Sequence, residues 1–244
     1  MDTNAISEDV VKMMLKKGIL FGHKKSKTHP KMREYIAGNR NEIELLNPES
    51  VWESLASALA FCREKSKEGA LVLFVGTTPP AQEVIEKTAK ELDSPYVTSR
   101  WLGGTLTNFS IIRKRVKYYE DLMEKREKGE FERYTKKERH DFIQEIEKLS
   151  RTFEGLRNLT RVPDIVFIVD TEEHETAVRE ANKLNIPIVG IVNTNADPSV
   201  VRVPIFASDH SRDGIAWILE KVSEEFKAGR DQGEREKETQ EKHE

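Results

Sequence analysis

The feature that most constrains the fold is an alternation of short apolar runs with segments of helical periodicity. The runs at residues 70–75 and 165–169 contain no charged side chain, as expected of strands that are covered on both faces. Buried strands that alternate with helices predict an α/β fold, in which a parallel sheet carries helices on both faces. The expected strands are residues 70–75, 96–98, 165–169, 188–192 and 203–206.

The segment before the first of these strands predicts smaller elements. Residues 8–17 have the pattern of a short amphipathic helix. Residues 35–46 predict a hairpin with its turn at 38–41. Asn47 is a suitable cap for the helix that follows, with Pro48 at its first position.

Two seams of apolar residues interrupt the alternation between the second and third expected strands. In each seam, at 109–123 and at 142–156, apolar residues recur three and four positions apart, which is typical of coiled-coil helices. We expect an inserted antiparallel coiled-coil hairpin that protrudes from the sheet; a helical subdomain that lies flat on the core is the alternative. The predicted division is 1–107 with 156–227 as the α/β domain, 108–155 as the hairpin, and 228–244 as a disordered acidic tail.

Composition predicts the compartment and excludes some chemistry. Cys62 is the only cysteine of the 244 residues, so no disulfide can form within the chain; its helical spacing with Leu55 and Leu59 predicts a core position. No apolar run approaches the roughly 20 residues that span a bilayer, and the start lacks a signal-peptide pattern. We expect a cytoplasmic protein that does not contact a membrane.

Charge is balanced overall but unevenly distributed. Lys and Arg number 40 against 43 Asp and Glu, yet the stretch from Lys12 to Arg33 contains eight cations and no acid. Such a stretch repels itself unless a polyanion neutralises it, and Lys, Arg, His and hydroxyl groups contact RNA phosphates and sugars. RNA binding is the prediction, and a solvated surface is the alternative. The candidate RNA-binding residues are Lys24, Lys25, Lys27, His29, Lys31 and Arg33.

Other polar motifs predict no catalytic centre, cofactor or metal. Residues 76–80 follow a strand, where a phosphate could bind, but two prolines remove donors, so a plain turn is favoured. Polar residues also follow the later strands, among them Asp170, Asn193 and Asp209. They lack a nucleophile paired with a base, while a metal shared by His or Asp residues at the strand ends stays an alternative. Asp197, before Pro198, is expected to cap a helix.

Residues 100–109 read Arg-Trp-Leu-Gly-Gly-Thr-Leu-Thr-Asn-Phe. Glycines permit close backbone approach. The Arg100 guanidinium can donate two hydrogen bonds to a phosphate, and the Trp101 ring can stack on a base. A tight turn with Trp101 as a core anchor is the alternative. This string occurs with Phe-Gly-His at 21–23, His-Pro-Lys-Met at 29–32 and Asn-Thr-Asn at 193–195.

In this combination and order, these motifs make residues 8–226 resemble the ribosomal protein S2 family of bacterial small subunits. The resemblance implies a non-enzymatic protein with a flavodoxin-like three-layer sandwich. It implies 16S rRNA, neighbouring small-subunit proteins and the large mRNA-binding ribosomal protein one as partners, and no small-molecule substrate. Besides the basic residues above, the implied RNA contacts are Arg100, Trp101, Thr107, Asn108, Arg113, Arg115 and Lys117.

Two other functions stay open at this point. One is an α/β enzyme that acts on a phosphorylated small molecule, and the other is an RNA-binding factor that works off the ribosome. The chain also departs from the family pattern at the carboxyl edge of the sheet, where Asn193 replaces the usual Asp and residues 208–211 replace a Gly-Asn-Asp-Asp string.

Overall fold

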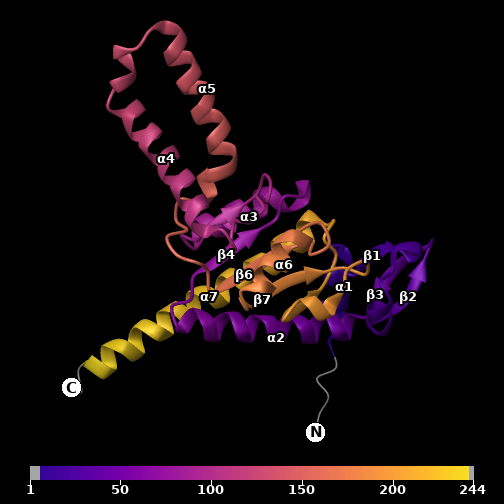
Figure 1. Ribbon diagram of the computed structural model, residues 1–244. Helices are drawn as coiled ribbons and strands as arrows, with labels where there is room; N and C mark the ends of the chain where they lie inside the picture. Colours follow the sequence, from indigo (N-terminus) through magenta and orange to yellow (C-terminus); the bar gives the residue numbers. More distant parts are fainter. Residues whose placement is uncertain (1–5, 242–244) are drawn as a thin grey trace.

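The computed structural model describes residues 6–241, and its centre is the predicted five-stranded parallel sheet (Figure 1). The spatial order β5-β4-β6-β7-β8 is the flavodoxin-like order 2-1-3-4-5 when these strands are counted along the chain. Every residue of the three central strands is buried. This confirms the prediction, made from their apolar runs, that these strands are covered on both faces. The strands are β4 Val72–Val75, β5 Tyr96–Val97, β6 Ile165–Val169, β7 Ile188–Val192 and β8 Val203–Phe206.

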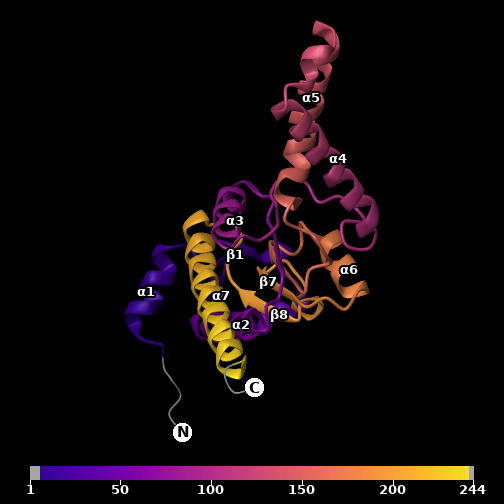
Figure 2. The ribbon, with the colours of Figure 1, turned by 90° about the vertical axis from the view of Figure 1, so that its left-hand side faces the viewer.

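Helices cover both faces of the sheet (Figure 2). One face carries α2 (Pro48–Lys67), α3 (Pro79–Glu91) and α7 (Arg212–Glu241), and the other carries α6 (Glu175–Lys183). The helix cap predicted at Asn47 is confirmed, because its side chain accepts a hydrogen bond from the N–H of Glu49 at 2.9 Å. Cys62 of α2 is fully buried as expected, and burial raises the pKa of its thiol to about 12. Within residues 6–241, no helix is long and apolar enough to cross a membrane.

A second, antiparallel sheet lies beyond the amino end of α2, with strand order β1-β3-β2. It follows helix α1 (Glu8–Lys16) and consists of β1 (Phe21–Lys24), β2 (Ile36–Arg40) and β3 (Ile43–Leu46). The hairpin turn lies at Asn41 and Glu42, both with positive φ, so the expected turn at 38–41 was placed too early. Strand β1 was not predicted, because Phe-Gly-His-Lys is too short and too polar to have a clear strand pattern.

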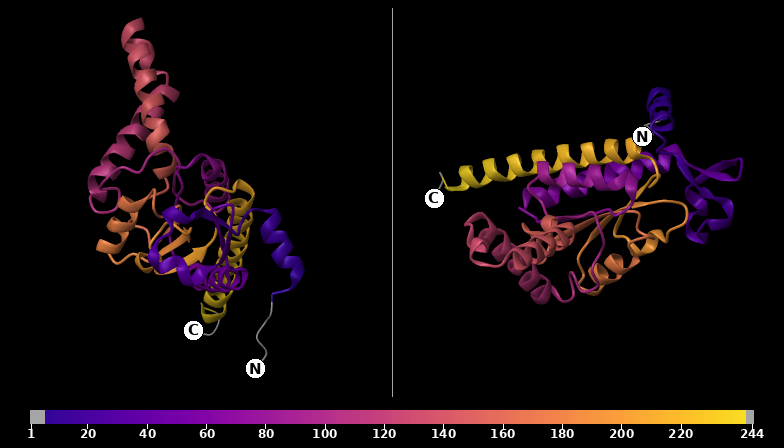
Figure 3. Two further views of the ribbon diagram at one scale, coloured as in Figure 1. Left: turned by 90° about the vertical axis from the view of Figure 1, so that its right-hand side faces the viewer. Right: turned by 90° about the horizontal axis from the view of Figure 1, so that it is seen from above.

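The insertion forms a pair of helices that extend away from the sheet (Figures 1 and 3). These are α4 (Phe109–Glu127) and α5 (Lys136–Phe153), joined by a turn that contains the short helix η3 (Glu130–Arg133). Val116 and Tyr119 of the first predicted seam are only 1 % exposed. The structure thus has a projecting hairpin where the sequence predicted one; coiled-coil packing of its seam stays a prediction.

The predicted disordered tail needs a correction, because α7 continues as helix to Glu241. Gly229 and Gly233 let α7 approach the backbone of α2: a Cβ on either would lie 2.4 Å from a carbonyl oxygen, that of Arg63 or Lys67. Lys67 also pairs with Glu236 at 2.6 Å. The segment packs through small residues instead of large apolar ones, so a composition test for disorder missed it. Residues 242–244 of the predicted tail lie outside the described residues.

Candidate nucleic-acid interface

The residues from Lys24 to Arg33, hereafter the basic segment, are held against the loop that follows β7. Lys24 ends β1, and two short 3-10 helices follow, η1 (Lys25–Lys27) and η2 (Pro30–Tyr35). The N–H of His23, just before the segment, donates to the hydroxyl of Thr194 at 2.8 Å, and the N–H of His29 donates to the carbonyl of Thr194 at 2.8 Å. The basic segment is therefore an ordered surface segment, held to the sandwich by hydrogen bonds.

Two residues predicted to contact RNA, Lys31 and His29, instead interact with other residues of the protein. The Lys31 ammonium donates to the Asp197 carboxylate at 2.8 Å and to the Ser199 hydroxyl at 2.6 Å, and His29 Nε2 lies 4.0 Å from the same carboxylate. Hydrogen bonding from Lys31 holds the pKa of Asp197 well below its usual range. Asp197 also accepts from the N–H of Ser199, which confirms its predicted capping role, here on the short helix η5 (Pro198–Val200).

The remaining four cations of the basic segment are available to a ligand. Lys24, Lys25, Lys27 and Arg33 are exposed, and in the part of the chain that the structure describes none forms an ion pair with a carboxylate. The backbone beneath them is anchored by Met32, which is fully buried. A fixed backbone that carries unpaired lysines can accept phosphates without first releasing internal partners.

The loop before the hairpin is organised by one carboxylate that sequence reasoning missed. Glu180 of α6 accepts the indole N–H of Trp101 at 3.1 Å and the N–H of Gly104 at 2.7 Å on one oxygen. Its other oxygen accepts the N–H groups of Leu106 and Thr107 and the Thr107 hydroxyl, each at 3.0 Å. Gly104 has a φ of +91°, which explains one of the two glycines.

Glu180 is 8 % exposed, and its environment favours the ionised form. Burial raises the pKa of this carboxyl, but the hydrogen bonds from Thr107, Gly104 and Trp101 outweigh burial, so its pKa lies below the ordinary value. Trp101 is thus half-buried with its indole N–H engaged, as in the core-anchor alternative. Nothing in the sequence beside Glu180 marks its role, since its partners lie more than 70 positions away.

The other predicted contacts lie around the root of the hairpin. Arg100, Thr107 and Asn108 are exposed, and Asn108 precedes α4 without a side-chain capping bond. Arg113 donates to the Arg157 carbonyl at 3.3 Å and lies 3.6 Å from Glu120. Arg115 and Lys117 are exposed and unpaired within the described residues.

The structure therefore does not bring all the predicted residues together. The basic segment lies at the small-sheet end of the molecule, and the hairpin rises from the opposite end (Figure 1). The two regions form separate surfaces.

The carboxyl edge of the sheet gathers three potential cation ligands, from His23, Asp209 and His210. The His23 and His210 ring nitrogens lie 3.4 and 3.5 Å from one oxygen of the buried Asp209 carboxylate, and the ligand atoms of all three residues lie within 4.8 Å of one another. Burial raises the pKa of Asp209, but the adjacent His23 ring and the hydrogen bond from the Asn193 amide lower it further than burial raises it. Imidazole and carboxylate are ligand types that zinc accepts, so this cluster is where the metal alternative would apply.

The turn at residues 76–80 has the plain structural role that its prolines predicted. Thr77 contacts the ring of the buried His174: its N–H donates to Nε2 at 3.2 Å, and its hydroxyl lies 3.0 Å from the same atom. The N–H of Thr77 is therefore used within the protein, and Pro79 and Pro80 supply no N–H.

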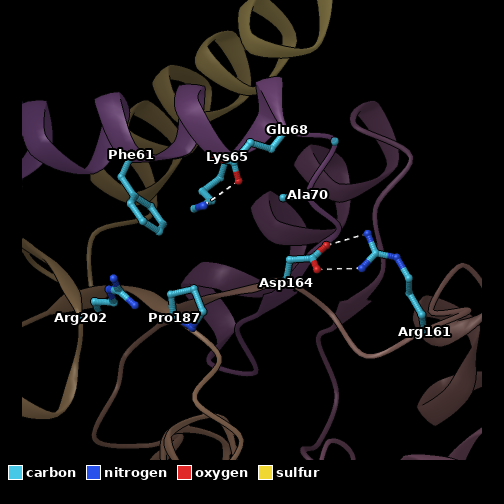
Figure 4. A pocket seen from close by; sticks show the side chains of 9 residues that line it. Phe61, Lys65, Glu68, Ala70, Arg161, Asp164, Pro187 and Arg202 are labelled. Atoms are coloured by element: carbon cyan, nitrogen blue, oxygen red, sulfur yellow. Dashed lines mark hydrogen bonds and ion pairs between the residues drawn. The ribbon is translucent and has the colours of Figure 1, made fainter. Parts of the chain in front are cut away.

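A cavity of about 370 Å³ opens at the amino ends of the strands, beside α2 (Figure 4). Four of its charged groups pair with one another: Lys65 pairs with Glu68, and Arg161 pairs with Asp164, each at 2.6 Å. Arg202 also lines the cavity. These pairs are solvated and involve no nucleophile, so the cavity offers no acid–base machinery. The fold and these surfaces define an α/β sandwich protein with two exposed cationic regions.

Comparison with known proteins narrows that class. A family model described as ribosomal protein S2 matches residues 14–229. Small ribosomal subunit protein uS2 of Dictyoglomus turgidum is 42 % identical over 231 residues, which cover 95 % of this chain and 94 % of the relative. The protein of the same name from Coprothermobacter proteolyticus is 41 % identical, with 91 % and 82 % covered, and that from Psychromonas ingrahamii is 37 % identical, with 90 % of each covered. The chain belongs to the ribosomal protein S2 family, whose members are structural proteins and not enzymes.

Proposed function

We propose that this chain is a structural component of the small ribosomal subunit that works in the cytoplasm and binds 16S rRNA through the basic segment. Membership of the S2 family supports the ribosomal assignment. The observation that carries the RNA contact is the set of four exposed, unpaired cations on an anchored backbone, Lys24, Lys25, Lys27 and Arg33. They contact phosphates, which fixes the position of the protein on folded RNA without reading its sequence.

The other predicted residues act in two ways in this proposal. Lys31 and His29 hold the basic segment to Asp197 and so orient its free cations. Arg115 and Lys117 make a second phosphate contact at the root of the hairpin. That root is oriented by the loop of Arg100, Trp101, Thr107 and Asn108, which joins it to the sheet.

We further propose, from the family resemblance, that the assembled protein supports docking of the large mRNA-binding ribosomal protein one. The test is whether subunits reconstituted with this chain retain that protein during sedimentation. Equal retention by subunits that lack the chain would reject the proposal.

The RNA contact is tested by replacing Lys24, Lys25 and Lys27 together with Glu. The matched control replaces Lys87, Lys125 and Lys183, which are exposed lysines outside the basic segment, so both variants change the charge by the same amount. Binding to small subunits depleted of the protein is measured over a range of salt concentrations. We expect the first variant to lose incorporation and to reduce the log–log salt slope by about 2 to 3, since each phosphate contact adds roughly 0.7 to 0.9.

Melting curves should be similar for wild type and both variants, because exposed charges contribute under about 1 kcal/mol each. Equal incorporation of the first variant and the wild type would refute the assignment of the basic segment to RNA.

A further inference from the structure

The small sheet has an outer face that combines exposed apolar side chains with a lysine. Phe21 of β1 lies opposite Leu45 of β3, and Lys24 lies opposite Ile43. Directly opposed residues of an antiparallel pair share one face of the sheet. Phe21 is 42 % exposed and Ile43 is 39 % exposed, so this face presents an aromatic ring to solvent beside the start of the basic segment.

The backbone that carries Phe21 is fixed on both sides. The carbonyl of Leu20 accepts the N–H of Leu46 at 2.9 Å. The next residue, Gly22, lies so close to Thr194 that a Cβ would be 2.5 Å from its methyl carbon. The ring therefore projects from a preorganised platform, which lowers the conformational cost of binding a flat ligand.

Unpaired lysines flank the ring in sequence on both sides. Lys16 and Lys17 precede it, and Lys24 and Lys25 follow it; among residues 6–241, none of the four forms an ion pair with a carboxylate. Lysine is depleted at protein–protein interfaces, whereas an aromatic ring within a cationic surface is typical of platforms for single-stranded nucleic acids. The chemistry of this face thus favours RNA over an acidic protein segment.

We propose that Phe21 stacks on an unpaired base of the ribosomal RNA while Lys24 and Lys25 contact the adjoining phosphates. The base is unpaired because bases within an RNA helix are stacked on one another and are inaccessible to a side chain. This inference rests on the proposed function and adds a base contact to its phosphate contacts.

The test compares Phe21→Ala with Phe21→Trp, which keeps a stacking ring. Trp52→Ala is the matched control, because Trp52 is also a partly exposed aromatic, 36 % exposed, but belongs to α2. Each protein is titrated onto small subunits depleted of the wild type, and base reactivity of the rRNA is read by chemical probing. Base–aromatic stacking predicts that Phe21→Ala raises Kd about 5- to 150-fold and exposes one or a few unpaired bases that the wild type protects.

Phe21→Trp should keep both the affinity and the protection, and Trp52→Ala should change neither. A photoreactive benzophenone amino acid in place of Phe21 identifies the neighbour directly in assembled subunits, and we expect cross-links to unpaired rRNA nucleotides. Wild-type affinity and protection in Phe21→Ala, or cross-links only to protein or to paired nucleotides, would overturn the inference.

The lysine variant separates this inference from the proposed function. If replacing Lys24, Lys25 and Lys27 weakens binding while Phe21→Ala does not, only the stacking contact is wrong. If neither change affects binding, the RNA-binding assignment of the whole face fails.

Discussion

Replacing Glu180 with Ala tests whether one carboxylate holds the hairpin loop. The change removes the acceptor for three backbone N–H groups, the Trp101 indole and a hydroxyl. A buried donor left without an acceptor costs about 1 to 3 kcal/mol, and loop relaxation will let water reach some of these donors. We therefore expect the free energy of unfolding to fall by about 3 to 5 kcal/mol, in the range for breaking a buried charged network.

The matched control is Glu175→Ala on the same helix. Glu175 is exposed and pairs only with Arg179 in the described structure, so its loss should cost less than about 1 kcal/mol. Urea unfolding of the full chain at pH 7, followed by far-ultraviolet circular dichroism, measures both variants. Equal destabilisation by the two changes would refute the anchoring role of Glu180.

The pH dependence gives a second measure of the same contact. The pKa of Glu180 is lowered in the folded state, so its stabilising contribution is fully present above its ordinary pKa of about 4.3. It is lost as the pH falls through the lower folded-state value. Glu180→Gln keeps the shape but cannot ionise, so its stability deficit relative to the wild type should shrink as the pH falls below about 4. A deficit that stays constant from pH 7 to pH 3 would show that ionisation of Glu180 is irrelevant.

Two further predictions concern the helices that pack outside the central sheet. Gly229→Ala should lower the free energy of unfolding by about 1 to 3 kcal/mol, because its Cβ would lie 2.4 Å from the Arg63 carbonyl oxygen. Thermal unfolding measures this change. A stabilisation of about 1 kcal/mol, which is the gain in helix propensity alone, would contradict the close packing of α7 on α2. Deleting residues 114–150 and joining the ends with a short linker should leave one cooperative thermal transition, because most of the hairpin extends away from the sheet; loss of cooperativity would show that the sandwich depends on it.

The parallel sheet could be predicted because its signals are local and continuous. A run such as residues 165–169 is apolar at every position, and only a strand covered on both faces tolerates that in a short segment. The boundaries were less accurate, as in β4, which begins at Val72 and not at residue 70. The preceding residues are held by a long-range bond: Asp164 accepts the N–H of Leu71 at 2.7 Å.

Elements that depend on distant partners were missed for a common physical reason. Strand β1 exists because β3 pairs with it, and α7 packs along α2 at Gly229 and Gly233 because neither glycine has a Cβ to prevent it. Glu180 is a single acidic residue in an ordinary amphipathic helix, and only the folded loop shows what it binds. Spacing within one segment contains no information on such pairs.

The basic segment shows how structure refines a charge count. Of the eight cations from Lys12 to Arg33, Lys12 lies within 3.9 Å of Glu8 and Asp9 on its own helix, and Lys31 is bound to Asp197 from another part of the chain. The other six form no ion pair with a carboxylate in the described structure. The excess charge that needs a polyanion is therefore smaller than the count, and along the sequence it lies both before and after Phe21. Because a fixed cation array gains most from a ligand whose charges are equally fixed, folded RNA suits this surface better than a flexible acidic peptide, which would lose conformational entropy on binding.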